Sequence, residues 1–421
     1  MQYSALGMNH TLTLTELLGS KVYDAEGAIG GRVREVALTL QEDPARISTL
    51  IVKTRTGNCL LAFHAVKSIN GGVRAGTKAD DWPRDSGMEG LFLLERDLLD
   101  QQVIDVNGRK VVRVNDVDLL EEVIGNHVVL KVGSVDVGAR GAIRRLLKGV
   151  VPNTALHVLL RRIPPRAIPW EFVDLIETDP ARRVRLKISH DRLAKLHPAD
   201  IADIVEELAP DEREAVFETL DEEVAAEALE EVEPKLQKAI VESLDSDRAA
   251  DIVEEMDPDA AADLLKDLPE ERTEEILEEM APEEREEVSG LLSFEENSAA
   301  GRMTTEYISL GKDATAEEAI GALRNFEGGV ETVSTFFVVD AESKLVAAVP
   351  LAKLVLAEGQ ERLVSLAQAP LITCHPDARE TEVAELFDKY NLLTLPVVDD
   401  EKHLVGVITS DDVISLLRSK L

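Results

Sequence analysis

The chain has 421 residues, of which 81 are Asp or Glu and 46 are Lys or Arg, giving a formal net charge of −35. This acidic excess argues against general nucleic-acid binding, which needs cations facing phosphates, and favours a cation or a basic partner. The length suggests roughly three domains. No apolar run reaches roughly 18 residues, and "MQYSALGMNH" lacks signal-peptide features, so neither a transmembrane helix nor a leader is expected. Cys59 and Cys374 form no ligand pattern, which favours a reduced cytoplasmic protein.

Residues 11–76 and 90–190 are predicted to form two small β-domains. Leu17–Leu40 has a strand–turn–strand rhythm, and Asn107-Gly108 is a strong turn signal in what reads as a second copy of the same plan. The loose composition of Gly76–Gly90 predicts a linker between them. The stretch "LLGSKVYDAEGAIGGRVREV" resembles PRC-barrel domains, which implies two small β-barrels but indicates no function for them.

Residues 140–166 are basic and contain no acid. This segment is a candidate contact for RNA, for anionic lipid or for an acidic neighbour, whereas a solvated surface or an internal ion-pair face explains it more simply. The cations are Arg140, Arg144, Arg145, Lys148, Arg161, Arg162 and Arg166.

Residues 191–300 carry an internal repeat. The phrase "ADIVEELAP" at Ala202–Pro210 returns as "ADIVEEMDP" at Ala250–Pro258. Apolar residues with i, i+1 and i+4 spacing recur every 12 residues, and Pro followed by an acid is a good helix start. Each 12-residue unit therefore predicts one helix of about two turns and a tight turn, and such short helices must stack into a continuous α-superhelix. The prolines that mark the double repeat are Pro210, Pro234, Pro258 and Pro282.

The repeat region also holds most of the negative charge, with 37 acidic and 7 basic residues in His197–Asn297. A solvated outer face explains most of these acids. However, Asp247 with Asp251, and Asp259 with Asp263, are i,i+4 pairs, so each pair can direct two carboxylates at one point. Oxygen-rich sites of this kind suit Mg²⁺ or Ca²⁺.

Residues 301–421 contain the order β-α-β-β-α twice, about 60 residues apart. "FFVVD" at Phe336–Asp340 and "LPVVDD" at Leu395–Asp400 are equivalent strands, each followed by a second strand and a helix. This order resembles a pair of CBS domains. Together with "MDPDAAADLLKDLP" and "LLSFEENSAAGRMTTEYISL", the chain from Leu193 onward resembles the intracellular part of MgtE-type magnesium transporters. The fold class expected for the chain is thus multidomain α+β: small β-barrels, an α-superhelix and an α/β CBS pair.

The resemblance implies a divalent-cation site between the superhelix and the CBS pair. In that family Mg²⁺ lies between acids of the two parts, and the matching positions here are Asp259, Asp263 and Asp412. Four further positions where the family places acids hold other residues, so only part of the metal cluster is carried over. These four are Arg379, Thr381, Asn391 and Ser415. The sequence given ends at Leu421, before any membrane domain, and so is expected to be a regulatory part only.

CBS pairs also commonly bind adenine nucleotides such as ATP or AMP. The family motif fits Gly406, Thr409 and Asp412, where Gly would allow close approach, Thr would face a phosphate and Asp would accept from ribose. The equivalent stretch of the first repeat, Ala347–Lys353, lacks all three features, so at most one competent site is expected. Helix N-capping at Thr409 or Ser410 explains the same residues without a ligand.

No nucleophile–base, phosphate-loop or zinc motif is present, so enzyme activity is not expected. The sequence predicts a cytoplasmic regulatory or sensor protein that binds Mg²⁺, and an adenine nucleotide as well, to change inter-domain packing. One alternative is an interaction scaffold that binds partner proteins through its barrels or superhelix. The other is an accessory subunit that docks on a separate membrane transporter. The family also implies a homodimer formed through the CBS pair.

Overall fold

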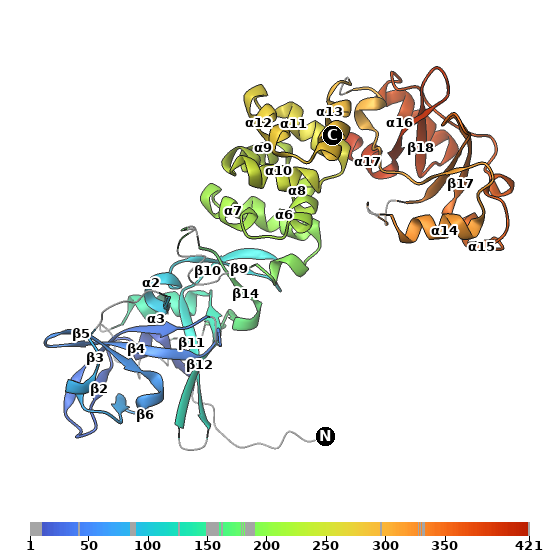
Figure 1. Ribbon diagram of the computed structural model, residues 1–421. Helices are drawn as coiled ribbons and strands as arrows, with labels where there is room; N and C mark the ends of the chain where they lie inside the picture. The colour runs from blue at the N-terminus through green and yellow to red at the C-terminus, as the bar shows by residue number, and fades with distance from the viewer. Residues whose placement is uncertain are drawn as a thin grey trace. The chain divides into compact units, whose positions relative to one another are not determined.

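The computed structural model describes residues 11–419 except 41–42, 85–89, 125–126, 149–159, 161–162, 178, 180, 182–189, 295–296, 327, 329 and 331–332. The chain divides into two compact units, Met1–Val224 and Ala225–Leu421 (Figure 1). Among the described residues the architecture is mixed: a strand-rich N-terminal part, short helices in the middle and an α/β C-terminal part. None of the helices in the described part of the chain has the length and apolarity that a membrane crossing requires.

The strands of the first unit form two successive halves with the same order, as the repeated sequence plan predicts. The first half contains β1 (Thr11–Thr13), α1 (Leu14–Leu17), β2 (Lys21–Tyr23), β3 (Ile29–Leu38), β4 (Ile47–Thr54), β5 (Gly57–Ala62), β6 (Val66–Ser68) and β7 (Val73–Ala75). The second contains β8 (Phe92–Leu93), α2 (Leu94–Asp97), β9 (Gln102–Asp105), β10 (Lys110–Arg113), β11 (Asp116–Ile124), β12 (His127–Asp136), α3 (Ala139–Leu146), β13 (Ala167–Pro169) and β14 (Val173–Leu175).

The two halves exchange their first strands. Strand β1 pairs with β11 of the second half, and β8 pairs with β3 of the first. The remaining strands pair mainly within their own half, in the orders β5-β4-β3-β2-β7-β6, β11-β12-β13 and β10-β9-β14. One hydrophobic core, which runs from Leu14 to Val173, contains side chains from both halves. The halves are therefore interlocked through strands and core alike.

A buried acid in each half caps the short helix of the other. Glu35 on β3 accepts hydrogen bonds from the backbone N–H groups of Glu95 and Arg96 at 2.8 and 3.2 Å, at the start of α2. Asp116 on β11 accepts one from Thr15 at 3.1 Å, at the start of α1. Since N-terminal helix amides otherwise lack partners, these carboxylates stabilise the exchange.

The basic stretch 140–166 is partly an internal ion-pair face. Arg144 on α3 is buried and contacts Asp116 at 2.6 Å, whereas Arg145 pairs with the more exposed Asp100. An internal ion pair, one of the predicted explanations, is found for Arg144, whereas the pair of Arg145 is partly exposed. Arg161 and Arg162 lie outside the described residues.

Eight short helices begin at intervals of 12 residues, which confirms the predicted repeat period. Their bounds are α6 (Pro198–Glu207), α7 (Pro210–Phe217), α8 (Glu222–Glu231), α9 (Pro234–Ser243), α10 (Ser246–Glu254), α11 (Pro258–Asp267), α12 (Glu270–Glu279) and α13 (Pro282–Leu292). In the second unit, alternate helices pack on one another: α9 on α11, α10 on α12 and α11 on α13. The recurring apolar positions, such as Ile252 and Ile276, are fully buried, so the repeat builds the core.

The C-terminal part repeats one β-α-β-β-α motif, as predicted. The first copy has β15 (Ser309–Gly311), α14 (Ala316–Arg324), β16 (Thr335–Val339), β17 (Leu345–Pro350) and α15 (Leu351–Leu356). The second has a single parallel bridge at Cys374, then α16 (Glu380–Tyr390), β18 (Thr394–Val398), β19 (Leu404–Thr409) and α17 (Ser410–Ser419). A connector containing the 3-10 helix η5 (Ala300–Arg302) joins α13 to this part, and its Thr304 pairs with Val407 of β19.

Candidate cation site between the helical repeats and the CBS region

Asp259 and Asp412 lie on helices from different parts of the second unit and act on each other electrostatically. Asp259 is in the first turn of α11, and Asp412 is in the first turn of α17. Burial raises the pKa of Asp259 well above its usual range, and the negative charges of Asp412 and Asp257 raise it further. The structure thus brings together two of the three predicted metal ligands, at a place where their charges repel.

The side chain of Asp412 is fixed by Thr409. Its Oδ2 accepts hydrogen bonds from the backbone N–H and the hydroxyl of Thr409 at 2.9 and 2.6 Å. Burial raises the pKa of Asp412 to about 6, although the bonds from Thr409 oppose this shift. A carboxylate oriented in this way can offer its remaining oxygen lone pairs to a cation at neutral pH.

Three further acids extend the cluster, and the sequence interpretation did not include them. Burial raises the pKa of Asp257, and the charge of Asp411 on α17 adds to the effect. Burial also raises the pKa of Glu230 on α8 to about 8, helped by the charge of Asp257, whose backbone N–H donates to Glu230 at 2.7 Å. The sequences "DPDA" at 257–260 and "SDD" at 410–412 contain two of these acids, Asp257 and Asp411, but only the folded chain brings them near each other.

Asp263, the third predicted ligand, is paired with a protein cation. Its Oδ2 lies 2.7 Å from Nη1 of Arg302 in η5, and its Oδ1 lies 3.9 Å from Nζ of Lys266. Nε of the same arginine lies 3.2 Å from Oε1 of Glu380 on α16. Carboxylates suit a hard cation such as Mg²⁺. Asp263 would have to exchange its guanidinium partner to act as a metal ligand beside Asp259 and Asp412.

The four positions where acids are missing have structural explanations in part. Arg379 is the N-cap residue of α16 and forms a backbone bridge with Ser298 of the connector. Asn391 ends the same helix in the left-handed region, with φ of 50°, which Asn adopts more easily than most residues. Thr381 is exposed. The side chain of Ser415 lies outside the described residues.

The predicted nucleotide residues Gly406, Thr409 and Asp412 make contacts within the chain. A Cβ at Gly406 would lie 2.6 Å from Sδ of Met303 and 3.0 Å from the carbonyl oxygen of Thr304. Glycine therefore allows the connector to pack closely against β19 here. Thr409 and Asp412 bind each other as a helix cap does. These contacts agree with the capping alternative, and nucleotide binding at the three residues stays a prediction.

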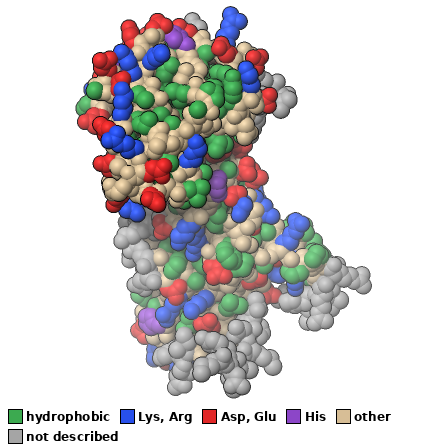
Figure 2. Space-filling model, turned by 90° about the vertical axis from the view of Figure 1, so that its right-hand side faces the viewer, with side chains coloured by type: hydrophobic (Ala, Val, Ile, Leu, Met, Phe, Trp, Pro, Cys, Tyr) green, Lys and Arg blue, Asp and Glu red, His purple; other side chains and the backbone are tan. Residues whose placement is uncertain are grey.

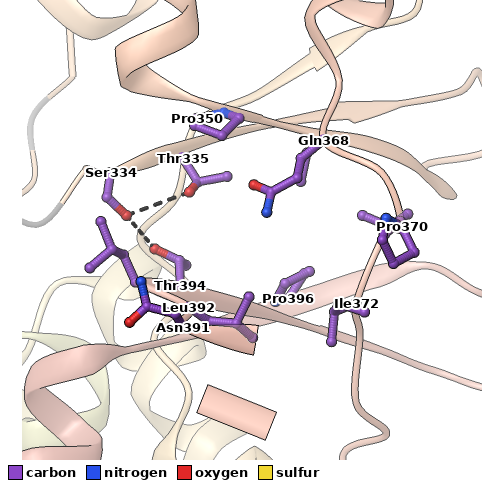
Figure 3. Close-up of a pocket in the computed structure, with 13 residues that line it drawn as sticks. Ser334, Thr335, Pro350, Gln368, Pro370, Ile372, Asn391, Leu392, Thr394 and Pro396 are labelled. Atoms are coloured by element: carbon purple, nitrogen blue, oxygen red, sulfur yellow. Dashed lines mark hydrogen bonds between the residues drawn. The ribbon is translucent and has the colours of Figure 1, made fainter. Parts of the chain in front are cut away.

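A pocket of about 150 Å³ lies between the two CBS-like motifs, beside the equivalent stretch of the first copy. Figure 3 shows the Gln368 amide in the space between Pro350 and Thr335 on one side and Pro396 on the other. Ser334 is hydrogen bonded to Thr394 at 2.6 Å across the motifs. The lining side chains are neutral: Ser334, Thr335, Ala348, Pro350, Gln368, Pro370, Leu371, Ile372, Asn391, Leu392, Leu393, Thr394 and Pro396.

A second group of possible metal ligands is explained by a turn. Asp399, Glu401 and His403 have ligand atoms within 4.8 Å of one another, and they are the one such group in the described part of the chain. Asp399 accepts a bond from the backbone N–H of His403 at 2.7 Å, and its other oxygen lies 2.8 Å from Nδ1. Asp340 accepts a hydrogen bond from the backbone N–H of Lys344 in the same way in the first copy.

The space-filling view shows acidic, basic and apolar side chains interspersed on the face that it presents (Figure 2).

Comparison with known proteins assigns these parts. Residues 196–297 match the MgtE intracellular N domain, and residues 364–419 match the CBS domain. The CBS match covers the second of the two β-α-β-β-α motifs. The magnesium transporter MgtE of Thermus thermophilus is 35% identical over 136 residues, and that of Enterococcus faecalis is 31% identical over 135 residues. Each match covers 32% of this chain and 30% of the transporter, so the chain matches less than a third of either relative.

Two solved structures resemble a larger part of the chain. The crystal structure of the soluble part of a magnesium transporter has a TM-score of 0.52 at 27% identity, and covers 55% of this chain and 91% of its own. The cytosolic domain of the Mg²⁺ channel MgtE in complex with ATP has a TM-score of 0.50 at 32% identity, and covers 53% and 92%. The part of this chain that they cover thus resembles the cytosolic structures of these two proteins.

Proposed function

We propose that this chain is a cytoplasmic regulatory protein in which a divalent cation controls how the MgtE N domain packs on the CBS pair. The observation that carries the proposal is that the buried Asp259 on α11 lies where the charge of Asp412 on α17 raises its pKa. Like charges brought together under partial burial destabilise this packing unless a proton or a cation neutralises them. The similarity to the cytosolic domain of MgtE supports Mg²⁺ as that cation.

The chain's own residues would act in three ways. Asp259 and Asp412 would supply oxygen ligands from the two domains, and Thr409 would hold Asp412 in position through its two hydrogen bonds. Asp257 and Asp411 would add negative potential that attracts the ion. Mg²⁺ keeps several of its waters, so a small number of carboxylates is enough to hold it. The ion would shift the packing only by as much as it binds the closed arrangement more tightly.

The test is the thermal unfolding midpoint of the full chain as a function of Mg²⁺ concentration, with Ca²⁺ and a matched ionic strength of NaCl as controls. A folded-state site predicts saturable stabilisation that follows RT ln(1 + [L]/Kd) beyond the salt control. A shift that NaCl reproduces would reduce the effect to screening of the acidic surface and would contradict the proposal.

We further propose the pocket between the CBS motifs as the place for an adenine-containing ligand. Its support is the cleft itself, with polar neutral groups such as Gln368 and Thr394 among prolines and leucines, and the ATP complex of the structural neighbour. Titration calorimetry with adenosine, AMP and ATP would test it. Thr394→Trp, which should fill the pocket, is expected to abolish the heat signal, and binding that survives this change would point to Thr409 and Asp412 instead.

Two other roles use the same domains differently. A scaffold would need no small ligand, and an accessory subunit would bind a separate transporter through its strand-rich part, for which we retain the PRC-barrel-like interpretation as a proposal. A homodimer through the CBS pair is also proposed. Light scattering of the full chain with and without Mg²⁺ gives its mass, and the absence of any Mg²⁺ or nucleotide response would favour the scaffold.

A further inference from the structure

Arg302 joins the N domain to the CBS pair through both of its contacts. It lies in η5 of the connector, between α13 and the first CBS strand. Nη1 contacts Asp263 of α11 at 2.7 Å, and Nε contacts Glu380 of α16 at 3.2 Å. One guanidinium therefore contacts a carboxylate from each domain.

These ion pairs are more shielded than ordinary surface pairs. The Glu380 side chain is 7% exposed, and those of Arg302 and Asp263 are 29% and 32% exposed. Shielding strengthens the attraction, and the planar guanidinium can hold two carboxylates at once in a fixed geometry. Removal of the arginine would leave Glu380 buried without this cation, which is costly.

The charge of Asp263 is thus balanced by the chain itself, whereas the charges that raise the pKa of Asp259 are those of other acids, Asp263 included. The two residues are one helical turn apart on α11. The neighbours that act on the pKa of Asp259 include the acids Asp412 and Asp257. Asp263 instead contacts Arg302 and Lys266. At Asp263, therefore, the junction contains a protein cation, Arg302, whereas at Asp259 it contains several acids close together.

We propose that Arg302 is a built-in cation that holds the N domain against the CBS pair in the absence of metal. It occupies Asp263, which therefore does not serve as a metal ligand in the packed arrangement. The inference rests on the proposed function only where it assigns cation binding to Asp259. The contacts of Arg302 do not depend on that function. Packing at low Mg²⁺ is then partial and depends on Arg302, and the divalent ion acts on the Asp259 end alone.

The test is the distance between spin labels on the two domains of the full chain, measured by electron–electron resonance. Labels attached at Glu271→Cys on α12 and Asp388→Cys on α16 suit this purpose, because both positions are exposed and both native cysteines are buried. The wild-type background, Arg302→Gln and Arg302→Lys are compared in EDTA and in Mg²⁺. The matched control is Arg362→Gln, which removes an exposed arginine paired with Asp313 inside the CBS region.

In EDTA, Arg302→Gln is expected to broaden the distance distribution and to lower the closed-to-open ratio about tenfold, because it removes both partly shielded ion pairs of Arg302. The closed-to-open ratio of Arg362→Gln should match that of the wild type. The ratio of Arg302→Lys should lie between those of the wild type and Arg302→Gln, because lysine keeps the charge but lacks the planar guanidinium that can hold two carboxylates. Equal distributions for Arg302→Gln and wild type in EDTA would overturn the inference.

The two proposals fail differently. Broadening by Arg302→Gln that Mg²⁺ cannot reverse would support the role of Arg302 and contradict the cation-controlled function. Narrowing by Mg²⁺ that is the same in every variant, from equally broad distributions in EDTA, would support the function and overturn the role of Arg302. Near-ultraviolet circular dichroism of each variant establishes that the domains are folded, and Arg302→Lys serves as the folded comparison if the glutamine variant is not.

Discussion

Asp412 accepts two hydrogen bonds from Thr409, one from the backbone N–H at 2.9 Å and one from the hydroxyl at 2.6 Å. The same carboxylate acts on the pKa of Asp259 across the junction. Asp412 therefore caps its own helix and also places its negative charge near Asp259 of the helical repeats. The capping bonds fix its orientation, so that its charge is presented at one place.

Replacing Asp412 or Asp259 with Asn should weaken the stabilisation by Mg²⁺. Each change removes one ligand charge, and we expect the Mg²⁺ concentration for half-maximal stabilisation to rise about tenfold, which corresponds to about 1.4 kcal/mol. The measurement is the unfolding midpoint followed by circular dichroism over a Mg²⁺ titration.

The control for this pair is Asp247→Asn with Asp251→Asn on α10. These acids have the same i,i+4 spacing and are exposed. They should leave the Mg²⁺ response within its error, so an equal loss in the control would mean that Mg²⁺ only screens the helical surface.

Stability in EDTA should fall as pH rises. The pKa of Asp412 is raised to about 6 and that of Glu230 to about 8, so between about pH 4 and pH 8 the folded chain holds more protons than the unfolded chain. Stability then decreases with pH, because the unfolded state binds fewer protons. Saturating Mg²⁺ should flatten the part of this dependence that comes from Asp412. A midpoint that rises over the same range would contradict the assignment.

Glu230→Gln should stabilise the chain at pH 8 and have little effect at pH 5. Glutamine keeps an acceptor for the backbone N–H of Asp257 but never carries the charge that burial disfavours. An increase of about 2–4 °C in the unfolding midpoint at pH 8 is expected for a gain of about 1 kcal/mol. Glu231→Gln, the adjacent position on α8, is the matched control, and an equal gain there would indicate a general charge effect.

Arg144→Met should destabilise the strand-rich unit by about 3–5 kcal/mol, because it leaves the buried Asp116 without its cation. Arg145→Met should cost less than about 1 kcal/mol, since its partner Asp100 is largely exposed. Both tryptophans, Trp82 and Trp170, belong to this unit, so urea unfolding followed by their fluorescence reports it selectively. Equal losses from the two changes would show that the Arg144 pair has no special role.

The sequence predicted the features that depend on local pattern. The spacing of Pro210, Pro234, Pro258 and Pro282 marks helix starts, because proline at the first helical position loses no hydrogen bond, and the helices begin there. The equivalence of the two CBS motifs followed from similar strands and turns. These signals lie within a few residues of one another, so the folded chain adds little to them.

The contacts that define the junction could not be predicted in the same way. Arg302 is 39 residues from Asp263 and 78 residues from Glu380, and no local pattern in the connector indicates these two partners. The exchange of β1 and β8 was also missed. A strand has the same alternation whether it pairs with its own half or with the other, so register with a distant strand leaves no local mark.

The exchange of β1 and β8 determines how one half of the first unit should behave when it is expressed without the other. Each half gives its first strand to the other half and receives one in return. This is the connectivity of a domain-swapped dimer, here within one polypeptide. Residues 11–84 expressed alone would have a β3 edge and a Glu35 carboxylate without their partners from the second half. Such a fragment is expected to pair with a second copy of itself. In the full chain the two halves belong to one polypeptide, so dilution cannot separate them.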